Sequence, residues 1–161
     1  KFGKKYLEVA GDGNRWEEFQ EMTNGIFKKF GFNVERQQHL QFSPGQSGYI
    51  DGYITHRLKA GFIDSKSGKK FDCGNKEVGV MKDYITKAKA LPTQLEFFGY
   101  VFGRKFSNTE GFNRIISESG LHGFRISAMN LLYLMKEFDS DKISKDEIWI
   151  LFKSNNEIQN W

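Results

Sequence analysis

Two aspartates and a lysine lie in short apolar segments that have the length of hairpin strands. Asp51 lies in the segment over residues 50–54, and Asp64 and Lys66 lie in the segment over residues 61–66. Side chains on a strand alternate between its two faces, so Asp64 and Lys66 would project to the same side. A hairpin would also bring Asp51 across the ladder towards Asp64. The pattern therefore predicts two carboxylates and one ammonium group close together at a strand end.

Side chains grouped in this way have a well-defined chemistry. Like charges that are held close together cost free energy, so a pair of carboxylates usually binds a cation or shares a proton. In proteins, Mg²⁺ is typically held by one or two carboxylates together with water and substrate phosphate. The sequence therefore predicts a Mg²⁺ site formed by Asp51 and Asp64.

The same residues also fit a purely structural interpretation. Asp51 followed by Gly52 is ordinary turn chemistry. Asp64 and Lys66 on one strand face could form a surface ion pair, which contributes little free energy. This stretch alone leaves both interpretations open, so the remainder of the chain has to distinguish them.

The composition indicates one folded domain over residues 1–161. Hydrophobic residues make up 39% and aromatic residues 16% of the chain, which is enough for a packed core. The formal net charge of +4 is compatible with a polyanionic partner but does not demonstrate one. The single Cys73 cannot form an intramolecular disulfide, which favours a reducing cytoplasm, and no apolar run approaches the roughly 18 residues of a membrane span. Because the chain begins with Lys1 rather than Met, we expect it to be part of a larger enzyme or a subunit of one.

The spacing of apolar and turn residues predicts an alternation of helices and strands. Residues 1–10 are basic and partly alternating, and we expect them to form a lead-in. The elements expected after it are a helix from Arg15 that ends before Gly31, a strand from Phe32 to Arg36, a loop from Gln37 to Gly48, the hairpin described above, a helix from Lys76 to Ala90, a buried strand from Leu95 to Phe102, a helix from Gly111 to Glu118, a strand from His122 to Ile126, a helix capped by Ser127, and a last helix capped by Ser144.

This order of elements resembles the PD-(D/E)xK nuclease superfamily, and within it the cleavage domain of type IIS restriction endonucleases of the FokI type. Asp51 resembles the first metal-binding aspartate of that family, and Asp64-Ser65-Lys66 matches its Asp-x-Lys motif, although Ile50 replaces the proline that often precedes the first aspartate. The similarity extends from about Gly25 to the end of the chain. The resemblance implies an α/β, restriction-endonuclease-like fold, with a mixed central β-sheet flanked by helices.

The resemblance also implies a function, which is Mg²⁺-dependent hydrolysis of phosphodiester bonds in double-stranded DNA, with Mn²⁺ able to substitute. Asp51 and Asp64 would hold the metal, with the Ser65 carbonyl as a further ligand. Lys66 would orient or deprotonate the attacking water. Relatives often place one more polar side chain from the first helix into the site, and Glu17 or Gln20 is the candidate here.

Four basic residues are candidates for contacts with DNA phosphates. Lys69 and Lys70 follow the proposed site, and Arg104 and Lys105 follow the buried strand. Basic pairs are also common on solvated surfaces, so this assignment stays open. Nothing in the sequence resembles a helix-turn-helix or a zinc module that reads bases. We therefore expect sequence recognition to lie in a separate domain or subunit.

One feature departs from the family pattern. Family members often dimerise through an acid–base pair on the helix after the lysine, but Gly79 and Asp83 occupy the corresponding positions. Dimerisation for double-strand cleavage is therefore one expectation and nicking of a single strand is another. Two further interpretations are a repair or junction-resolving nuclease of the same superfamily and a non-catalytic DNA-binding or scaffolding module.

Overall fold

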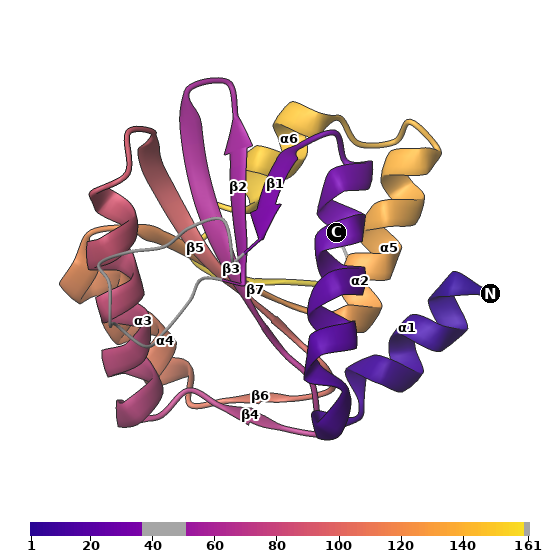
Figure 1. Ribbon diagram of the computed structural model, residues 1–161, viewed down its shortest axis with the longest axis horizontal. Helices are drawn as coiled ribbons and strands as arrows, with labels where there is room; N and C mark the ends of the chain where they lie inside the picture. Colours follow the sequence, from indigo (N-terminus) through magenta and orange to yellow (C-terminus); the bar gives the residue numbers. More distant parts are fainter. Residues whose placement is uncertain (37–50, 160–161) are drawn as a thin grey trace.

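A six-stranded sheet runs through the centre of the molecule, with helices on both faces (Figure 1). The computed structural model describes residues 1–36 and 51–159, so the predicted loop over residues 37–48 and Ile50 lie outside the described part. In sheet order, the strands are β1 (Asn33–Arg36), β2 (Gly52–His56), β3 (Lys59–Lys66), β5 (Gln94–Phe102), β7 (His122–Ser127) and β8 (Glu157–Ile158).

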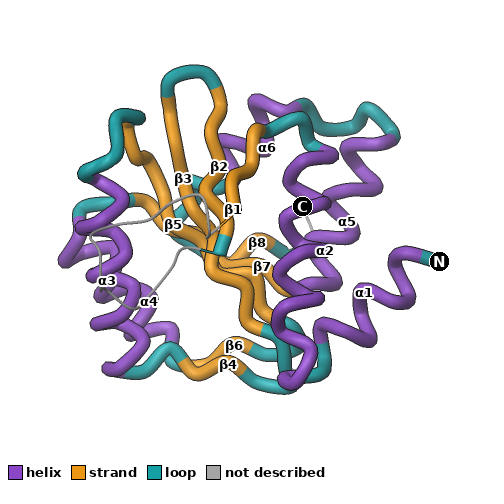
Figure 2. The backbone as a smooth tube through the Cα atoms, viewed as in Figure 1, coloured by secondary structure: helices purple, strands orange, loops and turns teal. Residues whose placement is uncertain are grey.

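The sheet is mixed, as the resemblance to the nuclease family implies. Strands β1, β2 and β3 pair in antiparallel fashion, whereas β3, β5, β7 and β8 are parallel neighbours. A separate parallel ribbon pairs β4 (Phe71–Asp72) with β6 (Phe106–Ser107), and Figure 2 shows it at one end of the molecule. The predicted β2–β3 hairpin and the α/β fold are therefore confirmed.

The helices form two groups on opposite sides of the sheet (Figures 1 and 2). None of the helices in the described part of the chain combines the length and apolar character of a membrane span. One group consists of α1 (Phe2–Ala10), the short 3-10 helix η1 (Gly13–Arg15), α2 (Trp16–Lys29), α5 (Ala128–Asp139) and α6 (Lys145–Leu151), and the other consists of α3 (Asn75–Lys89) and α4 (Thr109–Ser119).

Each face of the sheet has its own hydrophobic core. Adjacent residues of β5 belong to different cores, since Phe97 lies with α1, α2, α5 and α6 while Phe98 lies with α3 and α4. Strand β3 behaves in the same way, with Ile63 in the first core and Phe62 in the second. Side chains alternate along a strand, so a strand covered on both faces is apolar at nearly every position.

Glycine–phenylalanine pairs set how closely the central strands can approach each other. Three glycines lie directly opposite a phenylalanine of the neighbouring strand, and a methyl group on any of them would overlap that ring. Because glycine has no side chain, the ring opposite it can also occupy the space that a side chain at that position would take. The pairs are Gly61 with Phe97, Gly99 with Phe124, and Gly123 with Phe98.

Most predicted elements are present within a few residues of their expected bounds. The two expected helix caps are also present, because the Ser127 side chain accepts a hydrogen bond from the Asn130 N–H, and Ser144 forms a capping box with Glu147. The three shortest strands, β4, β6 and β8, were not predicted as strands. Each has only two residues, so its sequence shows no period that could identify it.

The prediction for residues 1–10 is wrong, because this segment forms helix α1. Tyr6, Val9 and Ala10 are buried at helical spacing, and the Tyr6 hydroxyl hydrogen-bonds the Thr23 hydroxyl of α2 at 2.7 Å. Lysines on the exposed side of α1 concealed this short apolar stripe. The helix therefore belongs to the folded core and is not a lead-in.

Replacing Gly99 with alanine should destabilise the protein by about 1–3 kcal/mol, since the new methyl group would displace the Phe124 ring in a close-packed core. Gly79→Ala is the matched control. Gly79 lies exposed inside α3 with open space around it, so alanine should stabilise the fold by about 0.5–1 kcal/mol. Urea unfolding measures both changes. Equal stability of Gly99→Ala and wild type would contradict the tight glycine–phenylalanine fit.

Candidate active site

The β2–β3 hairpin brings Asp51 and Asp64 together. Gly52 pairs with Ile63 in the antiparallel register, so the preceding Asp51 lies beside Asp64. The Ser65 N–H donates a hydrogen bond of 2.9 Å to Asp51 Oδ2. Asp64 is buried and Asp51 is partly buried. The hairpin geometry expected from the sequence is therefore present, with both carboxyl groups largely shielded from water.

Helix α2 fixes the backbone of Asp51 through two side-chain amides. Gln20 Nε2 and Asn24 Nδ2 each donate a hydrogen bond of 3.1 Å to the Asp51 carbonyl oxygen. These residues are four apart and so lie on one helix face. Of the two accessory candidates, Gln20 thus contacts Asp51, whereas Glu17 is exposed in the first turn of α2.

Sequence reasoning missed Asn24. Its side chain is 4% exposed, and its Oδ1 has no hydrogen-bond partner among the described residues. A Cβ atom on Gly52 would lie 2.5 Å from this oxygen, so only glycine leaves room for it. The available signals were a polar residue within the apolar stripe of α2 and a glycine directly after the first aspartate.

Lys66 lies between two carboxylates. Its Nζ is 3.2 Å from Asp64 Oδ2 and 3.8 Å from Oε2 of Glu77, a residue of the first turn of α3. Burial alone lowers the pKa of Lys66, but the negative charges of Asp64 and Glu77 outweigh it, so the pKa is raised and the ammonium form is favoured. Glu77 was not predicted, although its helical spacing with Met81 and Tyr84 could have placed it on the sheet-facing side.

The electrostatics of the site favour a bound cation. Burial, followed by the nearby charge of Asp64, raises the pKa of Asp51 well above its ordinary value. Burial and then the charge of Asp64 also raise the pKa of Tyr84 on α3. The Asp51 carboxyl group is therefore not easily ionised in these surroundings unless positive charge is added nearby. The site therefore lacks part of the positive charge that two ionised aspartates require.

Few protein ligands are available to such a cation. Within residues 1–36 and 51–159, no group of three or more histidine, cysteine or acidic side chains is arranged to hold a metal. Two carboxylates completed by backbone carbonyl groups and water suit Mg²⁺, which keeps several waters when bound to proteins. Ser65 is 6% exposed and follows Asp64 directly, and its carbonyl group as a metal ligand stays a prediction.

The four basic candidates lie side by side beyond Lys66. All four are exposed. Lys69 and Lys70 precede β4, Arg104 and Lys105 precede β6, and these two strands pair with each other. The Phe71 N–H donates to the Lys105 carbonyl oxygen at 2.8 Å, which holds the two loops together. The ribbon thus brings two basic pairs from distant parts of the sequence to one edge.

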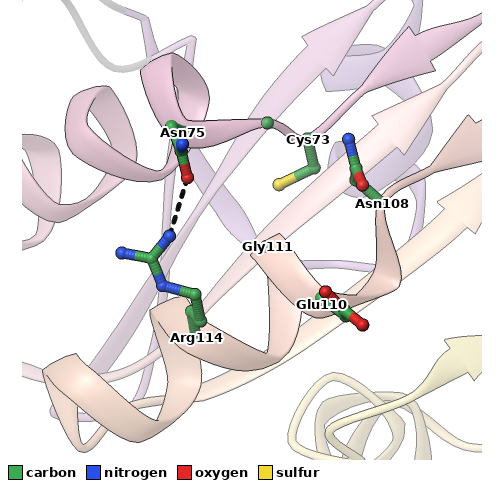
Figure 3. A pocket seen from close by; sticks show the side chains of 7 residues that line it. Cys73, Asn75, Asn108, Glu110, Gly111 and Arg114 are labelled. Carbon is green, nitrogen blue, oxygen red and sulfur yellow. Dashed lines mark hydrogen bonds between the residues drawn. The ribbon is translucent and has the colours of Figure 1, made fainter.

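A separate cavity of about 210 Å³ lies where α3 and α4 begin (Figure 3). Arg114 Nη1 donates a hydrogen bond of 2.8 Å to Asn75 Oδ1 across it. Cys73 also lines it, but burial raises the pKa of its thiol to about 11, so the nucleophilic thiolate is scarce at neutral pH. The residues lining this cavity do not include the two aspartates or Lys66.

Gly79 and Asp83 lie on α3, where the resemblance implies an acid–base pair for dimerisation. Gly79 is exposed and offers no side chain. Asp83 forms an ion pair of 2.9 Å with Lys87 of the same helix. The charge of Asp83 is therefore already partly neutralised within its own helix.

Comparisons with known proteins agree with this fold. The sequence model for the cleavage domain of FokI matches residues 1–159, which extends the similarity through α1, well before the expected start near Gly25. The structure of restriction endonuclease FokI has a TM-score of 0.80 and 17% identity, over 98% of this chain and 31% of that chain. The structure of FokI bound to DNA has a TM-score of 0.81 and 16% identity, over 98% of this chain and 30% of that chain.

At these identities the two structures establish the fold alone, and the chain spans less than a third of the length of either FokI chain. No curated protein is similar enough in sequence to match the chain. The family match, however, covers almost every residue of it. The chain therefore belongs to the FokI cleavage domain family, a family of restriction-endonuclease cleavage domains.

Proposed function

We propose that this chain is a single cleavage domain that hydrolyses phosphodiester bonds in double-stranded DNA with a divalent metal, Mg²⁺ or, as a substitute, Mn²⁺. The observation that carries the proposal is the convergence of Asp51, Asp64 and Lys66 at the end of β3, in a chain of this family. The deficit of positive charge at the two aspartates supports metal dependence.

Asp51 and Asp64 would hold the metal, together with the Ser65 carbonyl group. A bound divalent ion in such a site polarises the scissile phosphate, stabilises charge on the leaving oxygen and lowers the pKa of water. Gln20 and Asn24 act as positioning residues, because they fix the carbonyl group of Asp51. This arrangement keeps the first carboxylate aligned while the second is fixed by the central strand.

Lys66 would act next to the reacting phosphate. Its ammonium group can orient the attacking water and neutralise negative charge that develops on phosphate oxygens. Glu77 on α3 provides this ammonium with a second carboxylate, so Lys66 keeps a counter-ion even when Asp64 is engaged by a cation. The raised pKa of Lys66 favours the orienting role over that of a base.

Lys69, Lys70, Arg104 and Lys105 would guide the DNA backbone towards the aspartates. Contacts with phosphates carry no sequence information, so they suit a cleavage domain whose target sequence is recognised by another domain or subunit. The matched FokI chains are more than three times as long as the matched segment, which supports a separate recognition domain or subunit. Family membership supports this assignment over a repair nuclease or a scaffold.

The first of three predictions for the proposed function concerns plasmid cleavage with Mg²⁺ or Mn²⁺ at low salt. Asp51→Ala, Asp64→Ala and Lys66→Ala should each lower the rate by at least roughly 100-fold, because each removes metal binding or charge neutralisation. Asp139→Ala, at an exposed position of α5, is the matched control and should cut like wild type. The ratio of nicked to linear product distinguishes single-strand from double-strand cleavage. Folded variants that cut at the wild-type rate would refute the site assignment.

The second prediction concerns stability and pH. Because the pKa of Asp51 is raised in the fold, the folded state binds this proton more tightly than the unfolded chain, whose aspartates titrate near about 3.9. The resulting stabilisation is fully present below about pH 4 and is lost as the pH rises through the folded pKa. In EDTA, the melting temperature of wild type should therefore fall relative to Asp51→Asn between about pH 4 and 8.

Added Mg²⁺ should raise the melting temperature of wild type more than that of Asp51→Asn, because only wild type offers two carboxylates. If the melting temperatures of both proteins change equally with pH in EDTA, the pKa of Asp51 is not raised in the folded state, and the prediction is wrong.

The third prediction concerns the salt dependence of DNA binding. Binding to a DNA duplex is measured without metal as the association constant K at several salt concentrations. The slope of log K against log salt concentration should fall in magnitude by about 0.9 for each phosphate that the protein no longer neutralises. The variant with alanine at Lys69, Lys70, Arg104 and Lys105 should show this, with unchanged preference among sequences. Lys142→Ala, at an exposed position shortly before α6, is the control. An unchanged slope would place the DNA elsewhere.

A further inference from the structure

A groove lined mostly by apolar side chains lies between α1 and α5, bordered by the end of α2. Its cavity volume is about 360 Å³. Phe2, Met129 and Tyr133 line it and are 44%, 53% and 50% exposed. They are half of the large hydrophobic side chains that are exposed in the described part of the chain. Exposed apolar side chains that gather in one hollow, and are not scattered singly, make this groove a candidate interaction site.

Helix α5 shows how the groove arises from the sequence. Met129, Leu132, Tyr133 and Lys136 follow each other at spacings of three, one and three residues, so they lie on one face of the helix. Only Leu132 of this face is buried, and it lies under α1 beside Gly3. The helix therefore has a second apolar stripe beyond the one that it buries against the sheet.

The charges around the groove are all of one sign. Lys4 of α1, Lys29 of α2 and Lys136 of α5 line it, all three are exposed, and no acidic residue is among the described residues that line it. An apolar floor with a basic rim is complementary to a partner that has apolar anchors and acidic flanks.

The floor distinguishes a protein partner from nucleic acid. Leu7, Leu132 and Met135 offer no hydrogen-bonding groups to bases, and methionine side chains adapt to varied apolar partners. The groove also lies on the α1–α5 side of the sheet, whereas Lys66 contacts Glu77 on the α3 side (Figure 1). The residues that line the groove include none of Asp51, Asp64, Lys66 and the four basic candidates for DNA contacts.

We propose that this groove binds an amphipathic helix of a partner protein, with apolar anchors at helical spacing and glutamates or aspartates facing the three lysines. Such a helix lies in a groove through residues at positions i, i+3, i+4 and i+7, which matches the stripe on α5. The residues that line the groove are not among the proposed catalytic or metal-binding residues, so a variant in one surface leaves the other measurable.

A synthetic helical peptide with leucine at those four positions and glutamate flanks tests the proposal by fluorescence anisotropy against the full chain. Tyr133→Ser should weaken binding by roughly tenfold, because it removes a central anchor. Lys136→Glu should weaken it by roughly fivefold and should instead favour a peptide with lysine flanks. Ile150→Ser, which removes an exposed apolar side chain of α6 outside the groove, is the matched control and should bind like wild type.

Several results would overturn the proposal. A peptide with alanine anchors or with lysine flanks that binds wild type as well as the first peptide would show that the groove has no such preference. If wild type binds a single-stranded DNA oligonucleotide and Tyr133→Ser does not, the groove is a nucleic-acid surface instead. If wild type self-associates in sedimentation experiments and the same variant does not, the occupant is a second copy of the chain.

Discussion

The structure depends on holding two carboxyl groups side by side where water reaches them poorly. Free carboxylates in this position would move apart, because their mutual repulsion grows as water is excluded. The backbone of Asp64 is held in place, because β3 pairs with β2 on one side and with β5 on the other. Asp51 is fixed at three points, by the Ser65 N–H on its carboxylate and by Gln20 and Asn24 on its carbonyl group. The fold thus maintains an arrangement that only a cation or a shared proton relieves.

That rigidity comes from the central strands. The glycine–phenylalanine pairs interlock β3 with β5 and β5 with β7, and a shift of one residue would place each ring against a side chain instead of a glycine. Because β3 carries Asp64 and Lys66, its register also sets where these side chains lie relative to Glu77 on α3. The apolar core and the polar site are therefore fixed by the same pairing.

Local patterns in the sequence were sufficient to predict the hairpin and the grouping of Asp51, Asp64 and Lys66, because strand alternation and a tight turn determine their relative positions. They were insufficient for Asn24 and Glu77. A helical period can place each of them on the buried side of its helix, but it does not show that they reach Asp51 and Lys66, which lie 27 and 11 positions away in the sequence. Helix α1 was missed for the same reason, since its short apolar stripe has meaning only against Thr23 and α5.

Helix α2 borders both the aspartate site and the groove between α1 and α5, for which we propose different roles. One of its residues, Lys29, lines the groove, while Gln20 and Asn24 hydrogen-bond the Asp51 carbonyl oxygen. A helix with an unbroken hydrogen-bond ladder moves as one body, and interiors this closely packed do not absorb such a movement locally. A partner that shifted α2 at Lys29 would therefore also shift the two amides that hold the Asp51 carbonyl group. The proposed metal site would need both carboxylates within coordination distance, so the helix that positions Asp51 links this site to the surface around Lys29.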